Sequence, residues 1–344
     1  MQYRSIADMN AAIQAGMWRL PRDIDLVVGV PRSGLLAATL MSLTINAPLA
    51  DLDGYCEGRV LAVGKTRRRA ERVRAPGERR RVVVIDDSIF HGTAMREARR
   101  QVEEAGHGDD VTFVAVFGNG TDHKDADHVL EAVGQPRFFQ WNVMHHAILA
   151  DACMDIDGVL CHDPTADEND DGLNYERFLR EARPLAIPTR PVGTLVTSRL
   201  EKYRALTEAW LKEWGVEYGK LVMLDLPDME TRRRSRAHGS YKGQVYARSR
   251  ALLFVESEHH QSLEIVAASG KPVLCTCCFN LLRPGQHDPI ALRQQVATLP
   301  RRFVLAKTPL TNVRSAKLLV RRLVGDTVIR IAKRSLSTDR TRSR

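Results

Sequence analysis

Short apolar runs alternate with helical stretches along the first half of the chain. Residues 24–30 (IDLVVGV) form a Val-rich run, and after a tight turn the apolar stretch 35–43 has helical character. The same order recurs at residues 81–87 (RVVVIDD), where two acids end the run and an amphipathic stretch follows at 94–105. A further apolar run occupies 111–117. Strands that alternate with helices predict a parallel sheet with helices on both faces, and such sheets bind ligands at the carboxyl ends of their strands.

A second series of the same kind begins near residue 150. Its strand-like runs lie at 150–155, 193–197, 220–224, 251–255 and 272–275, with a helical pattern over 201–214. A chain of 344 residues is also long for one hydrophobic core. We therefore predict an α/β protein with two doubly wound, mainly parallel-sheet domains, over residues 1–148 and 149–300. A basic, partly helical C-terminal tail is expected over 301–344.

Composition indicates a globular protein without a membrane span. Hydrophobic residues make up 44% and charged residues 27%, which excludes extensive disorder and fibrous repeats. The apolar runs fall well short of the roughly 20 residues that a spanning helix needs. Residues 1–10 lack the apolar core of a secretory signal. We expect a soluble cytoplasmic protein, and one that forms a homo-oligomer.

The cysteines follow no disulfide pattern. Several lie in strand-like apolar stretches, which favours reduced, buried thiols. The group at 275–278 could also bind a metal, but no second Cys or His pair follows at a zinc-site spacing, so buried strand residues are favoured there. The six cysteines are Cys56, Cys153, Cys161, Cys275, Cys277 and Cys278.

The net charge of +9 is concentrated in a few segments. Basic residues gather at 66–81, at 231–236 and in the tail from Arg314 onward. Such charge suits nucleic acid, an anionic membrane or phosphorylated substrates. Because interleaved aromatic residues and a nucleic-acid motif are missing, nucleic acid is the weaker alternative. The pattern at 312–335 favours a terminal helix packed on its own domain, although a basic helix in contact with a membrane surface would also fit.

The segment VVVIDDSIFHGTAM at 82–95 is the strongest chemical signal. A buried strand delivers Asp86 and Asp87 to its end, where adjacent carboxylates can accept hydrogen bonds from the two hydroxyls of a ribose. The following loop and helix N-terminus can hold a monophosphate through backbone N–H groups. The candidate phosphate-binding residues are Ser88, Ile89, Phe90, His91, Gly92 and Thr93.

This segment resembles the signature of type I phosphoribosyltransferases. The resemblance implies that Asp86 and Asp87 hold the ribose 5-phosphate of a 5-phosphoribosyl 1-diphosphate donor. A second loop about fifty residues earlier looks like the diphosphate loop of the same family, which receives the leaving group together with Mg²⁺. Its residues are Pro31, Arg32, Ser33 and Gly34.

The basic segment between the two loops lies where the family carries a mobile flap. Lys65, Arg67 and Arg68 are the candidates to stabilise charge on the departing diphosphate. The implied reaction displaces diphosphate from C1 of the ribose, usually by a ring nitrogen, and the acceptor stays unidentified. Its hood could include Tyr55 and the segment 138–146, in which Trp141 is either a base-stacking residue or, by default, a buried core residue.

A second acid motif ends the apolar strand near residue 155, in ADACMDIDGVLC (150–161). Two carboxylates at positions i and i+2 can share one phosphate site. Asp155 would attack phosphorus, and Asp157 would exchange a proton with the leaving group.

This motif resembles the first motif of the haloacid dehalogenase superfamily, and further matches follow in order. Thr197 matches the hydroxyl that holds the phosphoryl group, and Lys242 matches the charge-screening lysine. Glu256 and Glu258 stand where the family places Mg²⁺ ligands, so the implied metal set is Asp155, Asp157, Glu256 and Glu258. The use of Glu, with Ser257 between, departs from the usual pattern. The insert 162–184 is short, which predicts a small cap.

Together the two resemblances imply a Mg²⁺-dependent phosphoribosyltransferase joined to a phosphomonoester hydrolase, in nucleotide or phosphosugar metabolism. The hydrolase substrate would be a phosphorylated small molecule, conceivably the ribosylated product of the first domain. The alternative is a regulator that binds the phosphoribosyl donor, or RNA, without turnover. Diphosphate release would separate the two readings.

Overall fold

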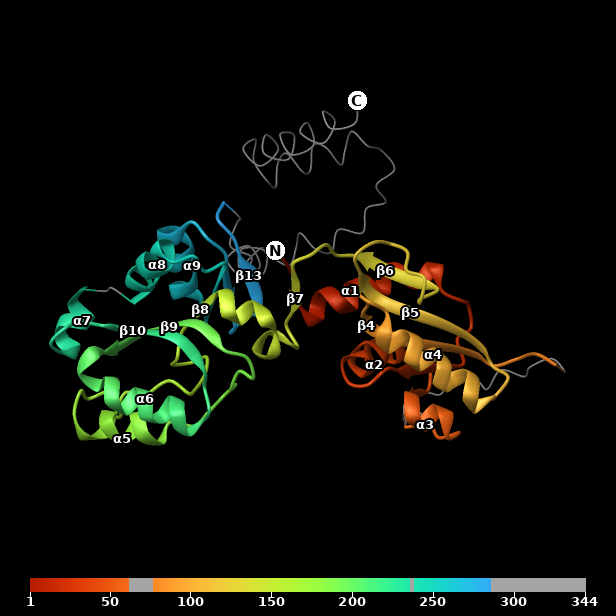
Figure 1. Ribbon diagram of the computed structural model, residues 1–344, viewed down its shortest axis with the longest axis horizontal. Helices are drawn as coiled ribbons and strands as arrows, with labels where there is room; N and C mark the ends of the chain where they lie inside the picture. Colours follow the sequence, from red (N-terminus) through yellow and green to blue (C-terminus); the bar gives the residue numbers. More distant parts are fainter. Residues whose placement is uncertain (62–76, 236–237, 286–344) are drawn as a thin grey trace, which may run out of the picture. The chain divides into compact units, whose positions relative to one another are not determined.

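Two mainly parallel sheets organise this computed structural model, which describes residues 1–61, 77–235 and 238–285 (Figure 1). The first sheet has the order β3-β2-β4-β5-β6, and every neighbouring pair is parallel. Its strands are β2 (Leu26–Gly29), β3 (Leu49–Asp51), β4 (Arg81–Ser88), β5 (Asp110–Gly118) and β6 (His128–Ala132).

Helices cover both faces of the first sheet. Alternate residues of β4 point to opposite sides: Val83 and Ile85 join a core with α1 and α2, whereas Val82 and Val84 join a core with α3 and α4. This period of two is what a strand buried on both faces requires. The predicted doubly wound α/β class is thereby confirmed. The helices are α1 (Ile6–Gly16), α2 (Ser33–Ile45), α3 (Leu52–Cys56) and α4 (Thr93–Ala105).

The second sheet has the order β10-β9-β8-β11-β12-β13, with only its last pair antiparallel. Its strands are β8 (Ala152–Met154), β9 (Val192–Leu200), β10 (Tyr218–Leu224), β11 (Leu253–Glu256), β12 (Val273–Cys275) and β13 (Asn280–Leu282). Its helices are α5 (Leu173–Glu181), α6 (Arg204–Glu213), α7 (Met229–Ser235), α8 (His238–Arg248) and α9 (His259–Ser269).

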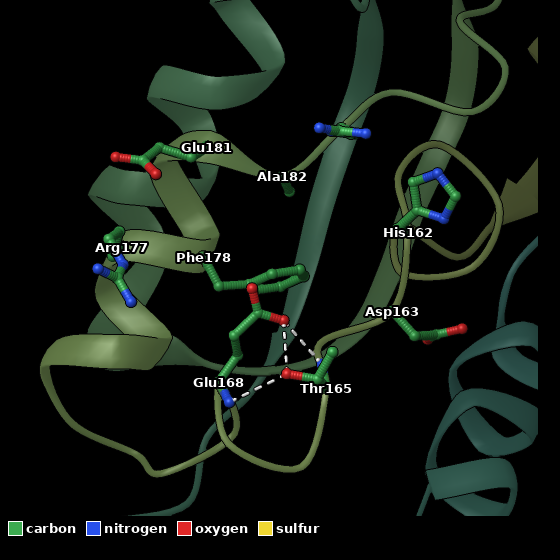
Figure 2. A pocket seen from close by; sticks show the side chains of 9 residues that line it. His162, Asp163, Thr165, Glu168, Arg177, Phe178, Glu181 and Ala182 are labelled. Atoms are coloured by element: carbon green, nitrogen blue, oxygen red, sulfur yellow. Dashed lines mark hydrogen bonds between the residues drawn. The ribbon is translucent and has the colours of Figure 1, made fainter.

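The insertion between β8 and β9 packs on the sheet rather than standing free. Thr165 donates hydrogen bonds of 2.9 Å from its backbone N and its Oγ to Glu168, which closes the loop before α5 (Figure 2). Tyr175 and Phe178 of α5 are buried in the core. The short insert is therefore anchored by its own apolar face.

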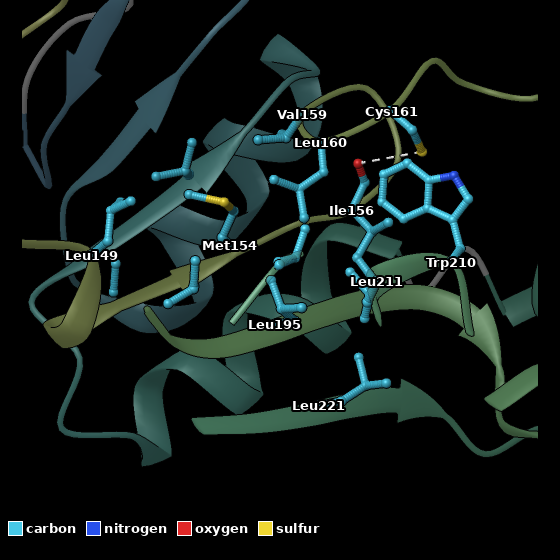
Figure 3. Packing of buried hydrophobic residues seen from close by; sticks show 14 of the residues in the cluster. Leu149, Met154, Ile156, Val159, Leu160, Cys161, Leu195, Trp210, Leu211 and Leu221 are labelled. Atoms are coloured by element: carbon cyan, nitrogen blue, oxygen red, sulfur yellow. Dashed lines mark hydrogen bonds between the residues drawn. The ribbon is translucent and has the colours of Figure 1, made fainter. Parts of the chain in front are cut away.

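Leu195 and Leu221 of neighbouring strands pack in the same core as Trp210 of α6 (Figure 3). On the other face of the sheet, Phe254 packs with Tyr246 of α8. The second sheet, like the first, is therefore buried on both sides.

A small two-stranded sheet joins β1 (Gln2–Arg4) to β7 (Arg137–Phe139) in parallel. Tyr3 and Phe138 of these strands are buried in the core of the second sheet, so the segment 138–146 begins as a packed connector, as expected. The short 3₁₀ helices are Met17–Arg19, Val143–His145, Ala147–Asp151 and Glu201–Tyr203.

Each large sheet has one point where the strand order reverses. In the first sheet β2 and β4 are neighbours but lead to α2 and α4 on opposite faces, and in the second β8 and β11 lead to α5 and α9 in the same way. Ligands of open α/β sheets bind outside the carboxyl ends of such strand pairs. Both acid motifs lie at these two points.

Among the helices of the described residues, none is both long and apolar enough to cross a bilayer. The tail predicted over 301–344 lies outside the described residues.

Candidate functional site

The acid pair Asp86 and Asp87 lies near the end of β4, beside the end of β2. The two residues are buried, with 8% and 6% of their surface exposed. Ser33, at the start of α2, donates a hydrogen bond of 2.8 Å to Oδ1 of Asp87. The structure thus brings the two predicted donor-binding loops together on one carboxylate.

The turn after β2 approaches the acid pair closely. A Cβ on Gly34 would lie 2.8 Å from the carbonyl oxygen of Ile85 and 2.9 Å from Oδ1 of Asp86, so a side chain there would push the turn away from β4. Pro31 and Arg32 are exposed at the tip of the turn, and the peptide bond between them is cis.

The predicted phosphate loop joins β4 to α4. Gly92 has a φ of +74° and immediately precedes the 13-residue helix α4. A Cβ at Gly92 would collide with the carboxylate of Asp125. The helix N-terminus therefore opens directly from the loop, which is the arrangement that binds anions. In the loop Ile89 is buried, Ser88 is half-buried, and Phe90, His91 and Thr93 are exposed.

Two arginines that were not predicted from the sequence donate hydrogen bonds to carbonyl groups of this loop. Arg137 is buried and donates to the carbonyl oxygen of Ile89 at 2.6 Å. Arg96 donates to the carbonyl oxygen of His91 at 2.9 Å and to Asp125 at 2.6 Å. Bonds to loop carbonyls hold the backbone in one conformation, so the loop is preorganised.

Trp141 is a second partner of the acid pair. Its Nε1 donates a hydrogen bond of 2.7 Å to Oδ2 of Asp87, and its ring stacks on Phe139 with centroids 4.7 Å apart. Phe117 extends the stack. Trp141 is half-buried, not a fully buried core residue. Its role as a hydrogen-bond donor to the acid pair was in neither alternative considered from the sequence.

The two carboxyl groups of the pair differ electrostatically. Burial, reinforced by repulsion from Asp87, raises the pKa of Asp86 to about 8. Oδ1 of Asp86 accepts a hydrogen bond of 2.8 Å from the backbone N of Asp87. Near neutral pH Asp86 therefore favours its protonated form, and a neutral carboxyl can donate to a ligand hydroxyl as well as accept.

The remaining predictions for this site concern the basic flap residues and Tyr55. Lys65, Arg67 and Arg68 lie outside the described residues. The suggestion that Tyr55 contributes to an acceptor hood is wrong: its ring is buried against α4, and its hydroxyl donates to Asp109 at 2.9 Å. Asp109 precedes β5, so Tyr55 points to the amino end of that strand, away from the acid pair.

The second acid site lies where β8 and β11 end side by side. Lys242 of α8 donates from Nζ to Asp155 at 2.6 Å, to Glu256 at 2.8 Å and to Gln261 at 2.9 Å. Lys242, Asp155 and Glu256 are all buried. One ammonium between two carboxylates leaves a net negative charge in a buried site, which favours a bound cation or an extra proton.

The pKa shifts in this cluster follow from its burial. Burial, opposed in part by Lys242 and reinforced by Glu256 and Asp157, raises the pKa of Asp155 to about 8. Burial opposes the charge on Lys242, but Asp155 and Glu256 outweigh it and raise the pKa of Lys242 above its ordinary value. The lysine therefore stays charged, and the proton that the cluster accepts goes to a carboxylate.

Asp157 is held by an arginine that the sequence reasoning missed. Nη2 of the fully buried Arg199 lies 2.6 Å from Oδ1 of Asp157, and Nε lies 3.1 Å from the same oxygen. Arg199 follows Thr197 by two positions on β9, and Thr197 is also buried. The alternation of a strand thus brings the predicted hydroxyl and this guanidinium to the same site.

The two predicted glutamates have different surroundings. Glu256 lies in the lysine cluster, and its second oxygen accepts from the backbone N of Ser257 at 2.9 Å. Glu258 caps α9 instead: its two oxygens accept from the backbone N atoms of His260 at 3.0 Å and Gln261 at 2.6 Å. The geometry thus gives Glu258 a structural task.

A cavity of about 440 Å³ is lined by residues of the insertion and of α5 (Figure 2). Asp163 lies on its rim, where partial burial and then the carboxylates of Asp157 and Glu256 raise the pKa of Asp163. Arg177 of α5 lines the same cavity. Asp163 is therefore the lining residue of this cavity that interacts electrostatically with the second acid site.

Comparison with known proteins gives partial similarities. No protein-family model matches the chain. Amidophosphoribosyltransferases from Synechococcus elongatus and Synechocystis sp. are each 32% identical to it over 126 residues, covering 30% of this chain and 25% of theirs. The chain thus spans about a quarter of the length of these relatives.

Solved structures give distant matches. UMP synthase of Leishmania donovani is 22% identical, covering 33% of this chain and 22% of its own, with a TM-score of 0.24. Xanthine-guanine-hypoxanthine phosphoribosyltransferase of Helicobacter pylori is 11% identical, covering 41% and 92%, with a TM-score of 0.30. Purine phosphoribosyltransferase of Pyrococcus horikoshii is 17% identical, covering 40% and 92%, with a TM-score of 0.29.

Proposed function

We propose that the site at the ends of β2 and β4 transfers a 5-phosphoribosyl group from its diphosphate to an acceptor. The observation that best supports this proposal is the hydrogen bond from Ser33 to Asp87. It joins the two predicted donor-binding loops at the point where the strand order reverses. The partial similarity to amidophosphoribosyltransferases supports this assignment.

Each part of the site has a task in this reaction. Asp87, oriented by Ser33 and Trp141, accepts from one ribose hydroxyl, and protonated Asp86 donates to the other. The N-terminus of α4 and the loop braced by Arg96 and Arg137 hold the 5-phosphate. The C1–O bond to diphosphate breaks as the acceptor atom bonds to C1, so diphosphate carries away the electron pair.

In this site Mg²⁺ would be held by the phosphates of the bound 5-phosphoribosyl 1-diphosphate rather than by protein side chains. Both oxygens of Asp87 already accept hydrogen bonds from protein groups, and Mg²⁺ is often held mainly by substrate phosphates. Bound in that way, it would supply neutralisation of the diphosphate charge.

The test is diphosphate release by the full chain given donor, Mg²⁺ and a panel of nucleobases. We expect release with at least one base, loss of release in Asp87→Asn, and retention in the control Asp110→Asn, which changes an exposed acid at the start of β5. Saturable binding of the donor with no release for any base would instead favour the regulator that binds without turnover.

For the second site we propose hydrolysis of a phosphate monoester. Lys242 holds Asp155 at 2.6 Å, and Arg199 fixes the orientation of Asp157. In its ionised form Asp155 attacks phosphorus through one oxygen, the bond from phosphorus to the ester oxygen breaks, and that oxygen takes up a proton by way of Asp157. Water then releases phosphate from the aspartyl-phosphate.

A Mg²⁺ ion also fits this second site. Asp155, Glu256 and the rim residue Asp163 offer only oxygen ligands, as Mg²⁺ prefers, and their charge exceeds that of Lys242. Bound there, the ion would supply neutralisation of the phosphoryl group. Release of phosphate from p-nitrophenyl phosphate should be lost in Asp155→Asn and retained in Asp167→Asn, an exposed acid of the insertion.

We further propose that the two reactions are consecutive, with the second removing the 5-phosphate of the ribosylated product. In a reaction with donor, Mg²⁺ and an accepted base, Asp155→Asn should accumulate the phosphorylated product, whereas the wild type should yield the free nucleoside. Equal yields of the phosphorylated product from both proteins would refute the coupling.

A further inference from the structure

Three potential metal ligands from separate segments converge at the end of β12. Cys275 is the last residue of β12, Cys278 lies in the turn before β13, and His259 is the first residue of α9. One ligand atom from each lies within 4.8 Å of the other two, and Sγ of Cys278 is 3.9 Å from Nδ1 of His259. These three ligand atoms already lie close enough together to share one ion.

A fourth candidate ligand lies next to this group. Sγ of Cys277 is 3.3 Å from Sγ of Cys275, and Cys277 is exposed, so its side chain has room to turn. The sequence disfavoured a metal because no Cys or His pair follows at a zinc-site spacing. The missing ligand comes from the start of α9, just after the neighbouring strand: Glu256 of β11 pairs with Cys275 of β12, and His259 stands three residues after Glu256.

We propose that His259, Cys275 and Cys278, completed by Cys277, bind a thiophilic divalent cation, with Zn²⁺ as the best fit. In a tetrahedral site with Zn–S bonds of about 2.3 Å, neighbouring sulfurs lie about 3.8 Å apart. The observed separation of the two sulfurs, 3.3 Å, is about 0.5 Å shorter than that value. The separation of 3.9 Å from sulfur to nitrogen is about 0.3 Å longer than the roughly 3.6 Å that Zn–N bonds of about 2.0–2.1 Å would give. Small side-chain rotations would close the site.

The ligand chemistry separates this site from the nearby acid cluster. Thiolates and imidazole select Zn²⁺ and other soft or borderline ions, whereas the oxygens of Asp155 and Glu256 suit Mg²⁺. The cation would tie the start of α9 to the turn after β12. This inference is independent of the proposed catalytic functions, because it rests on a different set of side chains.

The test uses the reduced full chain, stripped with a chelator and titrated with Co²⁺ alone. We expect about one Co²⁺ per chain, with the thiolate-to-cobalt absorbance and the tetrahedral visible bands that Cys ligation gives, and displacement by Zn²⁺. Cys278→Ser and His259→Ala should each weaken binding by more than the roughly 10- to 100-fold that loss of a supporting group costs.

Two further variants act as controls. Cys56→Ser changes a thiol of α3 outside the cluster and should leave the cobalt spectrum unchanged. Cys277→Ser should keep a weaker site with solvent as the fourth ligand. Circular dichroism of each variant separates loss of a ligand from loss of fold.

Several results would overturn the proposal. These are no cobalt–thiolate absorbance in a folded wild type, an unchanged spectrum in folded Cys278→Ser, or equal loss in Cys56→Ser. A Cys275–Cys277 disulfide in the isolated protein, with no metal uptake after its reduction, would assign the cluster to thiol oxidation instead.

Discussion

Ser33 donates a hydrogen bond of 2.8 Å to Asp87, although the two residues are 54 positions apart in the chain. The other oxygen of the same carboxylate accepts from Trp141, again 54 positions away. Three segments, the turn after β2, the end of β4 and the connector after β7, therefore meet on one side chain. The orientation of Asp87 depends on both donors.

Removing the hydrogen bond from Ser33 should impair turnover of 5-phosphoribosyl 1-diphosphate without unfolding the protein. A hydrogen bond to a charged group is worth about 1.5–3 kcal/mol, so Ser33→Ala should lower kcat/KM for diphosphate release roughly 10- to 100-fold. Thr44→Ala, on an exposed position of the same helix, is the control. An unchanged kcat/KM in Ser33→Ala would show that Asp87 is positioned without it.

Removing the second donor separates hydrogen bonding from stacking. Trp141→Phe keeps an aromatic ring against Phe139 but loses the Nε1 donor to Asp87. We expect an increase in the dissociation constant of the phosphoribosyl donor, measured by calorimetry, with a loss of unfolding free energy of about 1 kcal/mol. Trp18→Phe, at an 83% exposed residue, should alter neither quantity. If both variants bind the donor equally, the hydrogen bond has no part in binding.

The positions of the acid pairs could be predicted because their cause is local. Asp86 and Asp155 each follow a buried apolar run, and a parallel strand that ends in polar residues delivers them to the ligand-binding edge of its sheet. The same reasoning predicted two mainly parallel sheets covered by helices, but it missed the edge strands β3, β6 and β13. It needs only the period of the pattern and the handed connection between parallel strands.

The partners of those acids could not be predicted, because their causes are tertiary. Arg137 and Arg199 belong to apolar stretches in which a charged residue carries no signal of what it faces. Tyr55 was assigned to the wrong end of the sheet because the sequence does not show which way a helical side chain points. His259 and Cys275 meet only because β11 and β12 are neighbours.

Asp86 should make stability depend on pH. Its pKa is raised from 3.8 to about 8, so between these values the folded protein binds more protons than the unfolded chain. The free energy of unfolding should therefore fall as pH rises through this window. Asp86→Asn cannot ionise, so its thermal stability relative to the wild type should be greater at pH 9 than at pH 5. The control Asp110→Asn should show no such trend, and a gain in Asp86→Asn that is equal at both pH values would contradict the assigned protonation.

Lys242 should be essential for stability as well as for hydrolysis. Lys242→Met leaves Asp155 and Glu256 buried without their cation, and breaking a buried ion pair in this way costs about 3–5 kcal/mol. Urea unfolding at pH 7 measures the loss, against Lys220→Met at an exposed position of β10. The double variant Lys242→Met/Glu256→Gln should recover part of the stability, since it removes one of the unpaired charges. Equal stability of Lys242→Met and the wild type would show that the ion pairs of Lys242 do not stabilise the fold.

Glu256 and Glu258 should behave differently although both follow β11. Glu258 caps α9, so Glu258→Ala should lower the free energy of unfolding by about 0.5–2 kcal/mol and leave the Mg²⁺ dependence of phosphate release unchanged. Glu256 faces Lys242 and the reacting carboxylate, so Glu256→Gln should raise the Mg²⁺ concentration needed for half-maximal release or abolish release. A Mg²⁺ titration of p-nitrophenyl phosphate hydrolysis compares them directly. Glu258→Ala and Glu256→Gln could instead shift the Mg²⁺ titration equally. That result would mean that Glu258 leaves the cap of α9 to bind the ion, as the sequence predicted.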